Sequence, residues 1–123
     1  MKNIVVLVSG GGTNLQALID AEKRGAIKGG KITCVISSKA DAYALERAKN
    51  NGIKTRVLVR KDYDSVAAYS AAMRDTLLEE KADLVVYAGF MTILDDQVCD
   101  TFANKMINVH PALIPSFCGK GFY

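Results

Sequence analysis

The fold is decided by residues 2–14, which read KNIVVLVSGGGTN. All five residues from Ile4 to Val8 are apolar, a run typical of a strand that is buried on both faces of a parallel sheet. Three glycines follow, and they allow the backbone to turn tightly. Apolar residues then recur on one helical face from about Thr13 to Arg24, and Gly25 marks the end of that helix. The stretch therefore predicts a strand, a glycine loop and a helix.

The same alternation of strand and helix continues to the end of the chain. Further strands are predicted at residues 32–37, 53–59, 83–88 and from Met106, and further helices at 41–50, 65–77 and 95–102. We expect Asp41, and either Asp64 or Ser65, to cap two of these helices. Five alternations predict an α/β fold with a doubly wound, mostly parallel sheet. We expect one domain over residues 1–123, without repeats or linkers.

Composition narrows the class of protein. Half of the 123 residues are hydrophobic, which suits a single core, and the net charge of +3 is spread out without a Lys/Arg block. We therefore expect no nucleic-acid partner and no membrane surface. No run is long enough to span a membrane and no signal peptide opens the chain, so we expect a cytoplasmic protein. Three cysteines without a C-x-x-C pair, and a single histidine, predict no metal site.

Ligands of doubly wound sheets bind outside the carboxyl ends of the strands. Four segments of the sequence fall at that edge, and they are residues 9–14, 37–41, 89–94 and 108–111. A functional site is therefore predicted where these four segments meet.

The glycine loop suits a phosphate group. The helix behind it presents free N–H groups and a positive dipole end, and Thr13 and Asn14 add side-chain donors. A Walker loop would need Gly-Lys-Ser/Thr, and a dinucleotide fingerprint would need a glycine where Leu15 stands. A phosphomonoester is therefore favoured over a dinucleotide. The alternative is a turn without a ligand.

Two further segments are candidates for ligand binding. Residues 89–94 are apolar yet follow a strand, so they could hold a flat heterocycle or simply close the end of the sheet. Lys39, Arg60 and Lys61 follow strands at the same edge and could attract an anionic ligand, although solvated surface cations show the same pattern.

Asn108 and His110 form the most reactive pair in the sequence. His110 is the single histidine, so acid–base chemistry near neutral pH falls to it or to a strongly perturbed group. In a strand the two side chains would share a face, and Pro111 should end that strand. The alternative is a histidine that only fills the core.

Together these motifs resemble those of the phosphoribosylglycinamide formyltransferase family, folate-dependent enzymes of purine biosynthesis. The matching segments are VSGGGTNLQA at 8–17, SKADA at 38–42, AGFM at 88–91 and INVHPALIP at 107–115. The resemblance implies formyl transfer from 10-formyltetrahydrofolate to glycinamide ribonucleotide. It also implies roles for individual residues. Gly12, Thr13 and Asn14 would hold the substrate phosphate. Met91, Thr92, Ile93 and Leu94 would line the folate pocket through their backbone, together with Asn108. Asn108 would also stabilise the oxyanion, and His110 would handle the proton.

The chain departs from the family in two respects. Val66 stands where members usually carry a basic residue that helps to bind folate, and Lys61 is the candidate to compensate. Members also continue past the position of Tyr123 and supply an aspartate that orients the histidine. We therefore expect residues 1–123 to be an N-terminal portion with impaired activity. We also expect self-association through the surface left uncovered.

Other functions remain open from the sequence. Formyltetrahydrofolate deformylase and methionyl-tRNA formyltransferase share the Asn/His site. The first usually has an additional N-terminal domain, and the second typically lacks this glycine loop. A non-catalytic module that binds a phosphorylated metabolite would keep the glycine loop without the chemistry. Turnover that depends on His110 would separate an enzyme from such a module.

Overall fold

The computed structural model describes residues 2–27, 29–90, 92 and 94–108. Its strands are β1 (Lys2–Val8), β2 (Gly30–Ser37), β3 (Lys54–Val57), β4 (Leu84–Tyr87) and β5 (Met106–Asn108). Its helices are α1 (Thr13–Lys23), α2 (Tyr43–Asn50), α3 (Val66–Glu79) and α4 (Asp96–Thr101), with a short 3-10 helix η1 (Arg60–Asp62). Within the described part of the chain, none of the helices is both long and apolar enough to cross a membrane.

The strands form one sheet in the order β3-β2-β1-β4-β5, and every neighbouring pair is parallel. β1 lies at the centre and pairs with β2 on one side and β4 on the other. The predicted doubly wound sheet is confirmed. Because all five strands run the same way, the segments that follow them emerge at the same edge.

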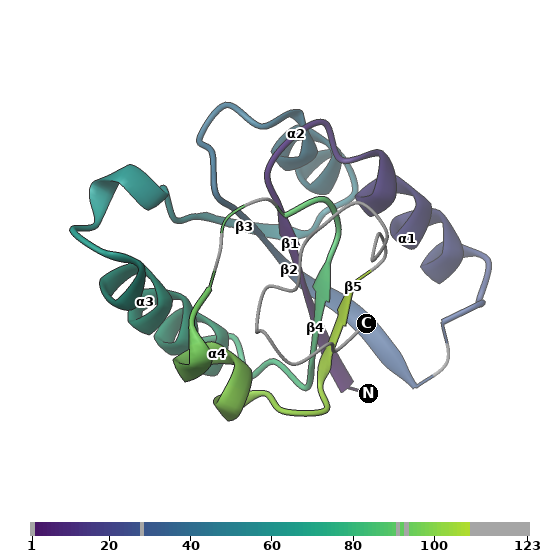
Figure 1. The fold of residues 1–123 in the computed structure, drawn as a ribbon. Helices are drawn as coiled ribbons and strands as arrows, with labels where there is room; N and C mark the ends of the chain where they lie inside the picture. The colour runs from purple at the N-terminus through teal and green to yellow at the C-terminus, as the bar shows by residue number, and fades with distance from the viewer. Residues whose placement is uncertain (1, 28, 91, 93, 109–123) are drawn as a thin grey trace.

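Helices cover both faces of the sheet. Figure 1 shows α1 and α2 on one side and α3 and α4 on the other. β1 supplies both cores, because successive side chains of a strand point to opposite faces. Ile4, Val6 and Val8 pack with α1 and α2, whereas Val5 and Leu7 pack with α3 and α4. This explains the continuous apolar run in β1.

The helix caps agree with the sequence where they are local. Ser65 caps α3, since its Oγ accepts a hydrogen bond from the Ala68 N–H at 3.1 Å. The prediction that Asp41 caps the second helix is wrong. Ala42 occupies that position without a side-chain cap, and the Ala44 N–H donates instead to the Gly10 carbonyl at 3.1 Å. A tertiary hydrogen bond has replaced the local one.

Ion pairs join β3 to the end of α3. The Glu80 carboxylate, whose side chain is 9% exposed, accepts from Lys54 Nζ at 2.7 Å and from Arg56 Nη1 at 3.1 Å. Arg56 also contacts Glu79, whose side chain is 62% exposed. Burial alone would raise the pKa of Glu80, but the hydrogen bonds from Lys54 and Arg56 outweigh it and lower that pKa below 4.5.

Glu80→Gln is expected to lower the free energy of unfolding by about 1–2 kcal/mol at pH 7, because it removes a charge-assisted pair. A carboxyl whose pKa is lowered by folding stabilises the protein above its ordinary pKa and loses this contribution as the pH falls through the lowered value. The difference from wild type should therefore shrink below pH 4.5. Urea unfolding between pH 3 and 7 measures it. Glu79→Gln is the matched control, with a smaller loss expected; a Glu80→Gln deficit as large at pH 3 as at pH 7 would contradict the assignment.

Candidate functional site

The predicted ligand edge is formed by residues that follow the ends of β1, β2, β3 and β4. Val8 and Ser37 are register partners at the ends of β1 and β2. Beyond them, Ser9 and Ser38 are both buried and their Oγ atoms lie 2.6 Å apart, which ties the first two segments together. The sequence offered no sign of this contact, since two serines that follow strands are common in any loop.

The glycine loop leads directly into α1. Gly12 is the N-cap residue, with φ of 81°, and its carbonyl accepts the first helical hydrogen bond from the Gln16 N–H at 2.8 Å. The N–H groups of the first helical turn, beginning at Thr13 and Asn14, have no acceptor within a helix. They also lie at the positive end of the helix dipole. This geometry suits a phosphate group.

Helix α2 holds the glycine loop through two hydrogen bonds and close packing. The Gly10 carbonyl accepts from the Ala44 N–H, and the Gly11 carbonyl accepts from Arg47 Nε at 2.7 Å. A Cβ on Gly12 would lie 2.7 Å from the Ala44 Cβ and 2.8 Å from its Cα. Position 12 therefore requires glycine for two reasons, the left-handed φ and the close approach of α2. Sequence analysis did not identify Arg47, although parallel topology places the start of the second helix beside the first loop.

The third segment approaches the glycine loop. Gly89 follows β4 with φ of 79°, and the atom nearest to where its Cβ would stand is Asn14 Nδ2, at 4.0 Å. The Asn14 side chain at the end of the glycine loop therefore reaches the segment that begins at Gly89. The structure brings these two together.

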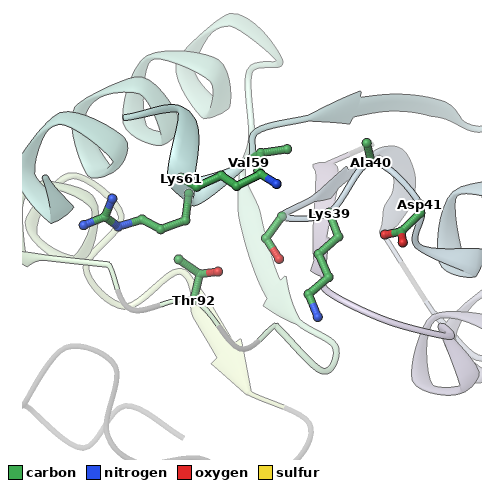
Figure 2. A pocket seen from close by; sticks show the side chains of 8 residues that line it. Lys39, Ala40, Asp41, Val59, Lys61 and Thr92 are labelled. Atoms are coloured by element: carbon green, nitrogen blue, oxygen red, sulfur yellow. The ribbon is translucent and has the colours of Figure 1, made fainter. Parts of the chain in front are cut away.

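A pocket of about 480 Å³ lies beside these loops. Lys39 follows β2, Arg60 and Lys61 follow β3, and Thr92 follows β4. Figure 2 shows Lys39, Lys61 and Thr92 around the pocket, with the Asp41 carboxylate at its side. Three cations and one carboxylate among the lining residues favour an anionic ligand.

The predicted folate residues divide between pocket and core. Thr92 lines the pocket, whereas the side chain of Leu94 is 1% exposed and packs in the core beside α3 and α4. Phe90 is equally buried and meets Tyr87 edge-on, with ring centroids 5.6 Å apart. The side chains of Phe90 and Leu94 thus close the end of the sheet. Met91 and Ile93 lie outside the described residues.

The proposed catalytic pair is only partly within the described structure. Asn108 is the last residue of β5, and its Cα is the register partner of Tyr87 at the end of β4. Its backbone therefore stands at the same edge as the glycine loop and the pocket. His110 follows two residues later and lies outside the described residues. Among the described residues no group of three or more His, Cys, Asp or Glu side chains is placed to hold a metal ion.

Comparison with known proteins gives consistent matches. The formyl transferase family matches residues 2–122. Phosphoribosylglycinamide formyltransferase of Haemophilus influenzae is 46% identical over 123 residues, which are all of this chain and 58% of that protein. The Escherichia coli protein of the same name is 45% identical, over 95% of this chain and 55% of its own length. The crystal structure of glycinamide ribonucleotide transformylase 1 from Symbiobacterium toebii superposes with a TM-score of 0.86 at 40% identity, over 94% of this chain and 54% of that one. The chain thus spans a little over half the length of these relatives.

Proposed function

This chain belongs to the formyl transferase family, and from that premise we propose that the protein transfers a formyl group from 10-formyltetrahydrofolate to the amino group of glycinamide ribonucleotide. The relatives named for that reaction support the proposal. The observation that carries it is that the glycine loop, the basic pocket and the Asn108 backbone share one edge of the sheet. The proposal concerns a protein of the relatives' length, in which residues 1–123 would be the N-terminal portion.

The glycine loop is the proposed phosphate subsite. Gly12, Thr13 and Asn14 would bind the phosphate of the ribonucleotide through backbone N–H groups and the two polar side chains. The first turn of α1 supplies both the hydrogen-bond donors and the dipole that this charge requires. A phosphate here would leave the rest of the nucleotide free to extend along the edge towards β4 and β5.

Asn108 and His110 are the proposed catalytic residues. The substrate amine attacks the formyl carbon, and the tetrahedral intermediate carries an oxyanion that an asparagine amide can stabilise by donating a hydrogen bond. The intermediate collapses when N10 of the folate leaves. An imidazole can accept the proton lost by the attacking amine and return one to N10, so the overall step needs no other proton donor. The two substrates provide the formyl group and the amine, and this step as written uses no metal ion.

The folate would contact Met91, Thr92, Ile93 and Leu94 through their backbone groups, with Asn108 beside its reactive end. Folates end in a glutamate, and the pocket that Thr92 lines also carries Lys39, Arg60 and Lys61. We propose that this cationic pocket takes the glutamate carboxylates. Lys61 would thereby take the place of the basic residue that family members usually carry at the position of Val66.

Lys61→Ala is expected to raise the KM for 10-formyltetrahydrofolate about threefold to fivefold, the size of one exposed ion pair. The KM for glycinamide ribonucleotide should not change. Lys105→Ala is the matched control, because Lys105 is exposed just before β5, at the opposite edge of the sheet. Steady-state kinetics with a folate analogue that lacks the glutamate completes the test. An equal increase in KM for that analogue would contradict a contact with the carboxylates.

The reaction itself is tested with full-length protein, glycinamide ribonucleotide and 10-formyltetrahydrofolate. The expected result is stoichiometric appearance of tetrahydrofolate and formylated ribonucleotide. A protein that binds the ribonucleotide but shows no turnover would instead be a binding module. A protein that hydrolyses the folate without the ribonucleotide would be a deformylase. Either result would overturn the proposed reaction.

A further inference from the structure

Arg47 connects α2 to the glycine loop by a set of specific contacts. Its Nε donates to the Gly11 carbonyl at 2.7 Å, and its Nη1 lies 3.4 Å from Gln16 Oε1 on α1. The guanidinium stands over the ring of Tyr43, 5.0 Å from its centroid. The planar group is therefore held by the loop, by a neighbouring helix and by an aromatic face at the same time.

Arg47 does not play the usual part of a basic residue near the end of a helix. Arg47 lies in the last turn of α2, where a basic residue ordinarily complements the negative end of the helix dipole. Helical side chains, however, lean towards the N-terminus of their helix. The Arg47 side chain follows that direction and contacts Gly11, beside the start of α2. Its charge is thus placed near the glycine loop.

The two loop carbonyls held by α2 fix the direction of two N–H groups. In a planar trans peptide the C=O of one residue and the N–H of the next point in opposite directions. The Gly10 carbonyl points to Ala44 and the Gly11 carbonyl points to Arg47. The N–H groups of Gly11 and Gly12 must therefore point away from α2. Glycine peptides would otherwise rotate freely between several orientations.

We propose that Arg47 is a positioning residue for phosphate binding. By holding the Gly11 carbonyl it keeps the Gly12 N–H directed towards the proposed phosphate subsite, and its charge adds to the positive potential there. This inference rests on the proposed function, because it assigns a role to the loop that binds the substrate phosphate. Arg47 itself needs no contact with the substrate.

Arg47→Met in the full-length protein is the main test, because methionine keeps most of the aliphatic stem and loses the hydrogen bonds. The dissociation constant of glycinamide ribonucleotide, measured by calorimetry, is expected to rise about tenfold, the value of one lost charge-assisted hydrogen bond. The KM for 10-formyltetrahydrofolate and kcat should stay within about twofold. Arg24→Met is the matched control: it also removes one positive charge, but Arg24 is exposed at the far end of α1.

Arg47→Lys separates positioning from charge and serves also if Arg47→Met does not fold. A lysine keeps the charge but cannot span Gly11 and Gln16, so at least a threefold loss of affinity is expected. Wild-type affinity in Arg47→Lys, or in a folded Arg47→Met, would overturn the positioning role alone.

Inorganic phosphate is the second probe. If wild type binds phosphate in an Arg47-dependent manner but not the ribonucleotide, the substrate is wrong and the positioning role stands; binding of neither overturns both.

Discussion

Gly12→Ala is expected to destabilise the protein by about 2–5 kcal/mol and to abolish most of its affinity for a phosphorylated substrate. Two separate effects add. A left-handed φ costs a residue with a Cβ about 1–2 kcal/mol, and overpacking against Ala44 costs about 1–3 kcal/mol more. The atoms in the way include the Ala44 Cα, which belongs to the backbone of α2. Relief therefore requires the loop to move away from the helix that holds it.

Matched glycines separate the two effects. Gly25 has a similar φ of 77° but open space where a Cβ would stand, so Gly25→Ala should show only the conformational loss. Gly11 has open space and no left-handed φ, and Gly11→Ala should be nearly neutral for folding. Urea unfolding of the three variants and calorimetry with glycinamide ribonucleotide give both readouts. Equal stability of Gly12→Ala and Gly25→Ala would contradict tight packing between the loop and α2.

His110→Ala is expected to lower kcat by about 10²- to 10⁴-fold while the affinity for glycinamide ribonucleotide changes less than twofold. The range is that of a positioned general acid–base group. His110 is the single histidine of residues 1–123, so it is the imidazole that this part of the protein can offer. Phosphate binding is proposed to depend on Gly12, Thr13 and Asn14 at the start of α1, which are far from His110 in the sequence. Binding and turnover should therefore separate cleanly in this variant.

Asn108→Ala provides the companion measurement. Removal of one oxyanion donor lowers kcat by about 10²- to 10³-fold, and the double variant with His110→Ala should lose less than the product of the single losses. Asn50→Ala controls for loss of an amide, since Asn50 is exposed at the far end of α2. A His110→Ala protein that retains more than a tenth of the turnover would assign the proton transfer to another group.

The elements that the sequence predicted well are those set by interactions between neighbouring residues. The apolar run forms the buried strand β1, and the serine before α3 caps that helix, both as predicted. β3 is shorter than the alternating stretch 53–59 suggested. Leu58 still donates to the Ser37 carbonyl, but its side chain is buried in the core beside α3 and α4 and η1 begins at Arg60. Alternation continues past the point where the sheet ends.

The features that sequence missed depend on contacts between distant elements. Asp41 has the right chemistry for a cap, but the Gly10 carbonyl already satisfies the α2 N-terminus. Arg47 looks like an ordinary surface charge until α2 is packed on the glycine loop. From the sequence, Lys39 and Lys61 could be either solvated surface cations or ligand-binding residues. Both line the same pocket, which favours a role in ligand binding. Each of these contacts depends on the order of the strands in the sheet.

The central position of β1 has a consequence for the order of folding. β1 pairs with β2 across a short βαβ connection, and the glycine loop, α2 and Arg47 all belong to the same early part of the chain. Pairing of β1 with β4 instead closes a far longer loop, and this pairing is what joins β4 and β5 to the other three strands. Long-range pairing slows folding, because the entropy of closing the loop is lost before contacts compensate. The proposed phosphate subsite thus has low contact order and can form early, whereas the Asn108 backbone reaches the same edge only once β4 has paired with β1.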